Sequence, residues 1–214
     1  MLARARSFLR PIEGSDKISE TLFNGGAKMN EFLQLIKNRR SIRQFKKEQV
    51  TNEEMQAIME AAIFAPNAMN QQKWHFSVIQ NKEMLDKMVS IIRENMCNSG
   101  VEFLAARAKE ASFDPFYGAP TVIYVTADAK AKFAAIDGAL AAENIALAAA
   151  SLNVGTNIQA SPGFLFASPA GEALKKEMGI PNGYAYVCNV TVGYPDGPVP
   201  EAKPRNSEVI TYIR

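Results

Sequence analysis

Histidine and cysteine are scarce in this chain of 214 residues, which has one histidine and two cysteines. The histidine is His75, and the spacing between Cys97 and Cys188 is not typical of a metal site. Proteins hold zinc mainly with clustered His and Cys side chains. We therefore expect no metal centre, and we interpret both cysteines as reduced thiols in a cytoplasmic protein.

Long apolar runs and glycine-rich phosphate motifs are also missing. The longest apolar stretch, residues 139–150, is interrupted by Glu143 and Asn144, so it falls short of the roughly 18 apolar residues that span a membrane. The chain has neither G-x-G-x-x-G nor G-x-x-x-x-G-K-[ST], the patterns that cradle a nucleotide phosphate with main-chain N–H groups. Any bound phosphate must therefore be held by side chains, and we expect no membrane partner.

A large excess of positive charge is absent as well. The chain has 24 basic and 22 acidic residues, which gives a formal charge of +2 at pH 7. Nucleic-acid-binding proteins usually carry a much larger basic excess. This balance argues against a nucleic acid as partner, although a basic nucleic-acid module stays open as an alternative.

What the sequence does contain is a compact basic stretch, RRSIR at residues 39–43, directly after an apolar helical pattern. Arginine keeps its charge at ordinary pH and offers a planar fork of donors that suits phosphate oxygens. Lys203 and Arg205, near the other end of the chain, add two cations that can join it. The simpler interpretation is a solvated basic helix end, where cations are favourable beside the last carbonyl groups.

Capping signals and periodicity predict helices and strands that alternate along residues 30–214. Asn30 caps a helix that runs to about Lys37, and Thr51-x-x-Glu54 is a capping box that opens a second helix ending before Pro66. Further helices are expected around 85–92, 101–110, 133–151 and 169–178. Strands are expected at 76–79, 121–126, within 152–158, and at 184–192, where strict alternation predicts one deeply buried face.

The N-terminal part differs from the rest. Three arginines in the first ten residues resemble a transit peptide, but the acidic residues that follow are typically absent from one. Another interpretation is that Met29 is the biological start. We therefore expect a leader without a catalytic role at residues 1–28 and one undivided domain at residues 29–214.

Five segments, in this order, together resemble the nitroreductase family of FMN-dependent NAD(P)H oxidoreductases. They are RRSIR at 39–43 with Phe45, APNAMNQQKWHF at 65–76, GAP at 118–120 before a strand, LNVGT at 152–156, and GYP at 193–195 followed by KPR at 203–205. The resemblance implies an α+β fold, with a central, mostly antiparallel sheet flanked by helices, and an intertwined homodimer with FMN sites at its interface.

The resemblance also implies a reaction. NADH or NADPH reduces the flavin at N5, and a small acceptor such as a nitroaromatic or a quinone then takes the hydride in a ping-pong sequence. The flavin carries the redox chemistry, so no side chain is expected as a covalent catalyst. Neither the acceptor nor the preferred nicotinamide can be read from the sequence. Reductive dehalogenation, flavin fragmentation, and a flavin sensor or store without turnover stay open as alternatives.

The resemblance assigns cofactor-binding residues to the two basic segments. From the first motif, Arg39, Arg40, Ser41 and Arg43 hold the phosphate, the ribityl chain and the pyrimidine edge of the flavin. Arg43 is expected beside the N1/C2-carbonyl edge, where it tunes the flavin. Near the C-terminus, Lys203 and Arg205 close on the phosphate.

Two further segments are assigned in the same way. Pro66, Asn67, Ala68 and Asn70 form a loop that reaches the flavin from the partner chain. The segment after the Ala-rich helix covers the flavin with Gln159, Ala160 and Ser161.

The chain departs from the family pattern in this loop and in the covering segment. Asn67 stands where the family usually has serine, and Lys73 stands where it usually has proline, which adds a cation near the site. Residues 159–162 match the family poorly. We expect acceptor specificity in an open, mobile aromatic segment that contains Phe113, Phe116 and Tyr117. We interpret Trp74 and Cys188 as packing residues and His75 as a histidine whose hydrogen bonds are satisfied, with no catalytic role.

Overall fold

The computed structural model describes residues 30–214, so the expected leader at residues 1–28 and the alternative start at Met29 lie outside the described residues. Four strands form one antiparallel sheet in the order β1-β2-β4-β3. The strands are β1 (Trp74–Ile79), β2 (Thr121–Asp128), β3 (Gly155–Gln159) and β4 (Tyr184–Gly193). This sheet, with helices on both faces, confirms the expected α+β class.

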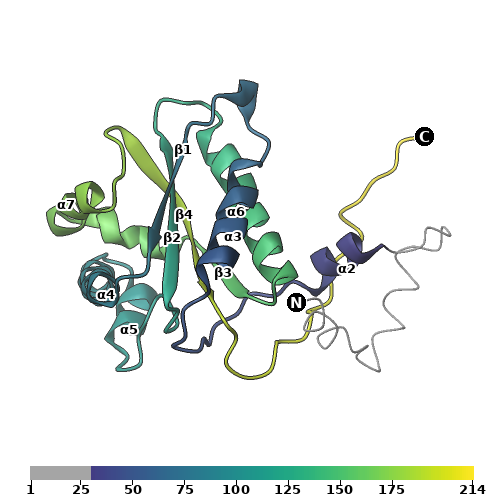
Figure 1. Cartoon of the computed structure of the whole chain (residues 1–214). Helices are drawn as coiled ribbons and strands as arrows, with labels where there is room; N and C mark the ends of the chain where they lie inside the picture. Colours follow the sequence, from purple (N-terminus) through teal and green to yellow (C-terminus); the bar gives the residue numbers. More distant parts are fainter. Residues whose placement is uncertain (1–29) are drawn as a thin grey trace.

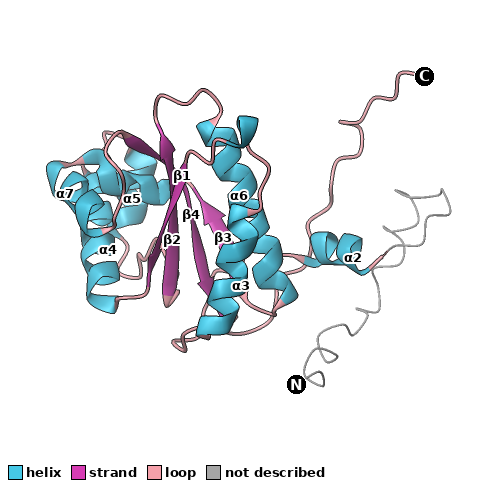
Figure 2. Ribbon diagram, turned by 45° about the horizontal axis from the view of Figure 1, so that its top comes forward, coloured by secondary structure: helices cyan, strands magenta, loops and turns pink. Residues whose placement is uncertain are grey.

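The helices form one layer on each side of the sheet (Figure 1, Figure 2). One layer contains α3 (Asn52–Ile63) and α6 (Ala134–Ser151), with α2 (Glu31–Asn38) beyond them. The other contains α4 (Lys82–Cys97), α5 (Glu102–Lys109) and α7 (Pro169–Glu177). Two short 3-10 helices, η1 (Ala68–Asn70) and η2 (Ser161–Ala167), complete the elements of the described chain.

The ends of several helices follow the sequence signals. The Asn30 side chain accepts a hydrogen bond from Leu33 N at 2.9 Å. Thr51 and Glu54 form the predicted reciprocal capping box, with Glu54 N donating to Thr51 Oγ1 at 3.2 Å and Thr51 N donating to Glu54 Oε2 at 2.9 Å. Gly179 ends α7 with φ +70°, a left-handed conformation that favours glycine. These three local predictions are confirmed.

Each face of the sheet has its own hydrophobic cluster. Val122 and Tyr124 of β2 belong to the cluster beneath α4 and α7, whereas Ile123 and Val125 belong to the cluster beneath α3 and α6. Because successive strand residues point to opposite faces, a strand covered on both sides is buried at every position. β2 fits this description from Thr121 to Ala127.

Small residues let α6 lie close to the sheet. A Cβ atom added at Gly138 would lie 3.2 Å from Cγ1 of Val187 and 3.3 Å from Cγ1 of Val125, tighter than ordinary packing. Five alanines of α6 are also buried: Ala134, Ala141, Ala142, Ala146 and Ala149. The Nδ2 group of Asn144 donates to the carbonyl of Ala61 at 2.9 Å and ties α6 to α3. The Ala-rich helix is therefore central, as its composition predicts.

The prediction that residues 184–192 present alternate side chains to one face is wrong. Val125 of β2 pairs with Cys188, but the next residue, Thr126, pairs with Tyr186. Val187 is thus the extra residue of a β-bulge, which shifts the alternation by one. Tyr186 packs against the cluster beneath α4 and α7, whereas Cys188 belongs to the cluster beneath α3 and α6.

The aromatic segment around residue 113 is packed. Phe113 and Phe116 are 8% and 2% exposed and belong to the core. Arg93 of α4 donates to the carbonyl groups of Ala108 at 2.8 Å, Glu110 at 3.0 Å and Phe113 at 2.8 Å. The expectation of an open, mobile acceptor region at Phe113 and Phe116 is wrong, because the half-buried guanidinium of Arg93 holds the segment against α4.

The C-terminal segment is exposed from Asp196 to Arg214 and extends away from the two helical layers (Figure 1). It carries large apolar side chains, including Val209 and Tyr212, each 75% exposed, and Ile213, 97% exposed. No helix among residues 30–214 is long and apolar enough to cross a membrane. Within the same residues, His, Cys, Asp and Glu form no group of three or more that could hold a metal ion.

Candidate functional site

The basic motif lies in an extended segment between β3 and the chain that follows β4. Ser41 forms an isolated parallel bridge with Thr156 of β3, and Ile42 N donates to the Thr156 carbonyl at 2.8 Å. On the other side, Phe45 forms an antiparallel bridge with Pro195. A Cβ atom added at Gly155 would lie 2.9 Å from Cγ1 of Ile42, so glycine permits this close approach. The motif is therefore held in place by main-chain contacts at Ser41, Ile42 and Phe45.

Three arginines from opposite ends of the chain gather at this segment. Arg40 Nη1 donates to the carbonyl groups of Lys37 at 2.6 Å and Arg39 at 2.8 Å, so it covers the C-terminal end of α2. Burial, together with the nearby positive charges of Arg205 and Arg39, lowers the pKa of Arg40 below its usual value. Like charges held this close favour the binding of an anion between them.

The charge of these arginines is only partly compensated. Arg39 Nε lies 3.5 Å from Oε1 of Glu143 on α6, within ion-pair distance. Even so, the Nε atoms of Arg39 and Arg40 are buried and have no hydrogen-bond partner among residues 30–214. A buried donor without a partner costs about 1–3 kcal/mol, more when the group is charged. An anion with several acceptor oxygens, such as a phosphate, fits this arrangement.

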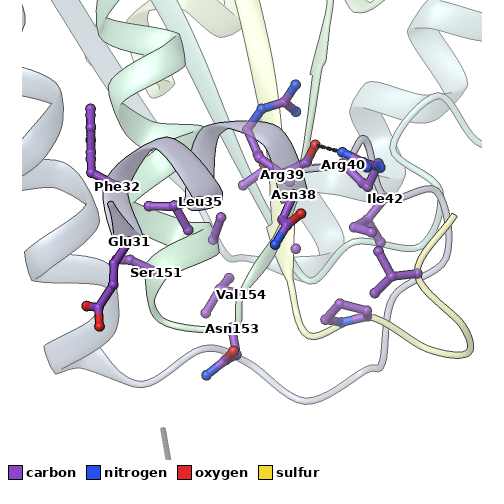
Figure 3. A pocket seen from close by; sticks show the side chains of 15 residues that line it. Glu31, Phe32, Leu35, Asn38, Arg39, Arg40, Ile42, Ser151, Asn153 and Val154 are labelled. Carbon is purple, nitrogen blue, oxygen red and sulfur yellow. Dashed lines mark hydrogen bonds between the residues drawn. The ribbon is translucent and has the colours of Figure 1, made fainter. Parts of the chain in front are cut away.

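A cavity of about 480 Å³ adjoins the arginines (Figure 3). Its walls come from α2, the last turn of α6, the start of β3 and the segment after β4. Apolar side chains line the cavity together with Arg39 and Arg40: Phe32, Leu35, Ile42, Val154, Pro195 and Val199. The cavity therefore combines an apolar wall with a cationic edge, a combination suited to a phosphate carried by an apolar or aromatic group.

The amide-rich loop is strained and polar. Met69, Asn70 and Gln72 have φ values of 53°, 52° and 51°, a left-handed conformation that is uncommon for residues other than glycine. The carboxylate of Asp137 accepts from Ala68 N, with both oxygens at 3.2 Å. Gln72 N also donates to Oδ1 of Asn67 at 2.8 Å. These contacts stabilise a conformation that would otherwise be unfavourable.

Within one chain, this loop does not meet the arginines. It follows the C-terminal end of α3, at the far end of that helix from α2 (Figure 1). Pro66 and Asn70 are exposed, and Asn67 and Ala68 are half-buried. Lys73, which follows this loop, pairs with Asp128 at 3.6 Å. The expectation that the hydrogen bonds of His75 are satisfied is wrong for Nε2, which is buried and has no partner among residues 30–214.

The covering segment lies at the end of β3, the strand that begins at the cavity. Gln159 is half-buried, Ala160 is exposed, and Ser161 opens η2. Gln159 Nε2 donates to the carbonyl of Pro115 at 2.8 Å. Arg43 and Lys203 are exposed, and no contact of either side chain within the described residues assigns it a role.

Sequence reasoning missed two carboxylates of α6. Asp137 holds the strained loop and Glu143 pairs with Arg39. Both interrupt an otherwise Ala-rich helix, and Asp137 is 7% exposed in its first turn. A buried or half-buried acid in such a helix is the signal that could have identified them, because acidic residues are rarely buried without a partner.

The fold and the arginine motif define the class of protein. The Nitroreductase family profile matches residues 36–194, and the chain belongs to this family. A putative NADH dehydrogenase/NAD(P)H nitroreductase of Archaeoglobus fulgidus is 33% identical over 172 residues, which cover 78% of this chain and 87% of that protein. An iodotyrosine deiodinase of Thermotoga neapolitana is 27% identical over 192 residues, covering 86% of this chain and 98% of that protein.

Two solved structures are similar over nearly the same range. A nitroreductase with bound FMN from Desulfitobacterium hafniense is 37% identical, with a TM-score of 0.79, and the match covers 87% of this chain and 100% of that one. A nitroreductase with bound FMN from Bacteroides fragilis is 29% identical, with a TM-score of 0.83 and the same two coverages.

Proposed function

We propose that this chain is an FMN-dependent oxidoreductase that moves hydride from NADH or NADPH to a small acceptor such as a nitroaromatic or a quinone. The observation that supports it best is the cluster of Arg39, Arg40 and Arg205, with two buried Nε atoms that have no hydrogen-bond partner among residues 30–214. FMN carries a phosphate that would satisfy them. Two similar structures are described as nitroreductases with bound FMN.

In this proposal the two ends of the chain hold the phosphate together. Arg39 and Arg205 bind its oxygens, with Lys203 beside them, and Arg40 adds positive charge while it covers the end of α2. Ser41 and Arg43 follow in the extended segment alongside β3. From Gly155 to Gln159 the strand rises about 13 Å. In this proposal the strand leads from the phosphate end towards the ring end of the cofactor, and Gln159, Ala160 and Ser161 would cover the ring.

The protein contributes position and electrostatics. When bound, FMN supplies the hydride-accepting chemistry. Arg43 presents a permanent positive charge to the pyrimidine edge of the ring, where reduction increases the negative charge. Such a charge stabilises the reduced form more than the oxidised form, which is the differential interaction that catalysis requires.

The proposal includes a homodimer in which the loop containing Pro66, Asn67, Ala68 and Asn70 completes the site of the partner. One chain keeps this loop away from its own arginines (Figure 1). Large apolar side chains are also exposed on the helical layer that contains α2, α3 and α6: Phe32, Ile36, Ile63, Phe64, Ile136 and Leu140. A large exposed apolar surface is typical of an interface.

The dimer is tested by sedimentation of the FMN-loaded protein at micromolar concentration. We expect about twice the mass of the 23.4 kDa chain. A monomer that carries one FMN per chain and is reduced at the full rate would exclude a site shared between two chains.

The activity is tested with the purified protein alone. Flavin absorption bands that bleach on addition of NADH or NADPH support the proposed function and exclude a passive flavin sensor or store. Flavin bands that both nicotinamides leave unchanged would contradict it. Absence of flavin, with no binding of added FMN, would contradict the cofactor assignment itself.

Reductive dehalogenation is the second candidate, because the Thermotoga neapolitana relative is named an iodotyrosine deiodinase. A direct comparison of the two acceptors separates the two activities. The reduced protein is mixed with a nitroaromatic in one experiment and with iodotyrosine in another, and flavin reoxidation is followed. Faster reoxidation by iodotyrosine, with release of iodide, would favour dehalogenation.

A further inference from the structure

The bulge at Val187 brings together two side chains that regular alternation would separate. Tyr186 and Asn189 are three positions apart, so an unbroken strand would point them to opposite faces. The extra residue returns Tyr186 to the face that carries Asn189, and the Tyr186 hydroxyl lies 3.1 Å from Oδ1 of Asn189. Bulges are over-represented next to active sites, where they re-aim side chains.

The two re-aligned side chains hold Gln159. The Tyr186 hydroxyl donates to the main-chain carbonyl of Gln159 at 3.1 Å, and Asn189 Nδ2 donates to Oε1 of Gln159 at 3.2 Å. Gln159 Nε2 donates in turn to the carbonyl of Pro115 at 2.8 Å. The main-chain carbonyl, the side-chain oxygen and the side-chain nitrogen of Gln159 therefore all form hydrogen bonds.

The surroundings prevent this network from relaxing. Asn189 is fully buried, and the ring of Tyr186 lies against Gly163, where an added Cβ atom would come within 2.5 Å of Cε1. Burial raises the pKa of Tyr186 well above its usual value, so the hydroxyl keeps its proton. The Tyr124 hydroxyl donates to the carbonyl of Pro162 at 3.2 Å, which secures the other side of the same turn.

We propose that Tyr186, re-aimed by the Val187 bulge, is a positioning residue that fixes the Gln159–Ser161 turn against the isoalloxazine ring. This inference rests on the proposed function, because it takes that turn as the cover of the flavin. Tyr186 and Asn189 act through Gln159 and do not themselves contact the cofactor. Residues 159–162 match the family pattern poorly, but this hydrogen-bond network still fixes the position of Gln159.

The test is Tyr186→Phe, which removes the hydroxyl and keeps the ring that packs on Gly163. Tyr184→Phe is the matched control, because Tyr184 packs against the same cluster and its hydroxyl makes no hydrogen bond within the described residues. Both proteins are loaded to equal FMN occupancy. Visible circular dichroism of the bound flavin and the rate of its reduction by NADH and NADPH are then measured.

In Tyr186→Phe we expect an altered flavin dichroism and slower reduction, with Tyr184→Phe like wild type. Because a misplacement of about 1 Å can cost roughly 100-fold in rate, the smaller movement expected here should slow reduction by about tenfold. A purely structural role would change the unfolding midpoint of the apoprotein and leave the dichroism at equal occupancy unchanged.

The outcomes separate this inference from the proposed function. If neither nicotinamide reduces the wild type, the proposed function fails whatever the variant does. If the wild type is reduced and Tyr186→Phe matches it in dichroism and rate, the positioning role is wrong and the proposed function stands. If Tyr186→Phe does not fold, Gln159→Met decides: it keeps the length of the side chain and removes the bonds to Asn189 and Pro115, and unchanged dichroism would again overturn the inference.

Discussion

Arg39 Nε lies 3.5 Å from Oε1 of Glu143, so an arginine assigned to a phosphate faces a carboxylate in the described chain. The side chains are 22% and 45% exposed, and ion pairs at such sites contribute at most about 1 kcal/mol. A bound phosphate would bring three oxygens and more charge to the same guanidinium. Glu143 therefore competes with the phosphate for Arg39.

Glu143→Gln keeps the shape of the side chain and removes its charge. We expect FMN affinity to rise by roughly twofold to fivefold, the equivalent of up to about 1 kcal/mol. Riboflavin, which lacks the phosphate, should bind as it does to wild type. Flavin titration of the apoprotein measures both, with Glu53→Gln on α3 as the control. Weaker FMN binding would mean that Glu143 orients Arg39 for the phosphate.

Arg205→Ala tests the C-terminal contribution. The phosphate would lose a charge-assisted hydrogen bond, which contributes about 1.5–3 kcal/mol. FMN affinity should therefore fall by at least about tenfold. Riboflavin affinity should not change, and Arg214→Ala, in the same exposed segment, should behave like wild type. Unchanged FMN affinity would mean that Arg205 is a surface residue without a role in binding and that the first motif holds the phosphate without it.

Arg43→Gln should retain FMN and lower its two-electron reduction potential. The fixed positive charge stabilises the reduced ring, so its removal favours the oxidised form; a change of about 1.4 kcal/mol corresponds to roughly 30 mV. The half-reaction that reduces the flavin should slow, while reoxidation by a quinone should not. A dye-equilibrated redox titration at matched FMN occupancy measures the potential, with Lys46→Gln as the control. An unchanged potential would show that another residue serves the N1 edge.

Tyr194 and Glu54 predict a pH-dependent contribution to stability. Burial raises the pKa of Glu54, but hydrogen bonds from Tyr194 and Thr51 outweigh it and leave the pKa below its usual 4.5. The Tyr194 hydroxyl donates to Oε2 of Glu54 at 2.6 Å, and the Glu54 carboxylate raises the pKa of Tyr194 to about 12. A carboxyl group with a lowered folded-state pKa stabilises the fold above its unfolded pKa, and this contribution disappears as the pH falls through the folded value.

Tyr194→Phe should therefore lower the free energy of unfolding by about 0.5–1.5 kcal/mol at pH 7, towards the lower limit because Glu54 is partly exposed. The difference from wild type should shrink at pH 3. Urea unfolding at both pH values measures it, and Tyr212→Phe in the exposed C-terminal segment is the control. A difference that is equal at pH 7 and pH 3 would mean that packing, and not the hydrogen bond, carries the effect.

Local features of the fold could be predicted from the sequence because their causes lie within a few residues. Asn30, the Thr51–Glu54 capping box and Gly179 each satisfy main-chain groups three to five positions away. The same holds for the cationic end of α2, where Arg40 covers the carbonyl groups of Lys37 and Arg39. The interpretation of the basic motif as a helix end is therefore confirmed for Arg40, and its binding of a phosphate stays a proposal.

Features that depend on distant contacts could not be predicted in this way. The segment around Phe113, expected to be mobile, is packed because Arg93 donates hydrogen bonds to carbonyl groups of α5 and of the residues after it. Glu143 and Asp137 meet their partners only after α6 packs against the rest of the domain. The residue pattern of a helix or strand predicts which of its faces is buried. It does not predict which side chain of another element will contact that face.

The bulge at Val187 limits which insertions the sheet can accept. One residue inserted between Val125 and Thr126 of β2 would give Val187 a regular partner, restore the alternation of β4 and turn Tyr186 towards α6. There the helix already leaves little room, since even a Cβ atom at Gly138 would lie 3.2 Å from Val187. A phenol ring could not fit without displacing α6. We therefore expect the length of β2 opposite this bulge to be preserved among functional relatives, even where the residue types change.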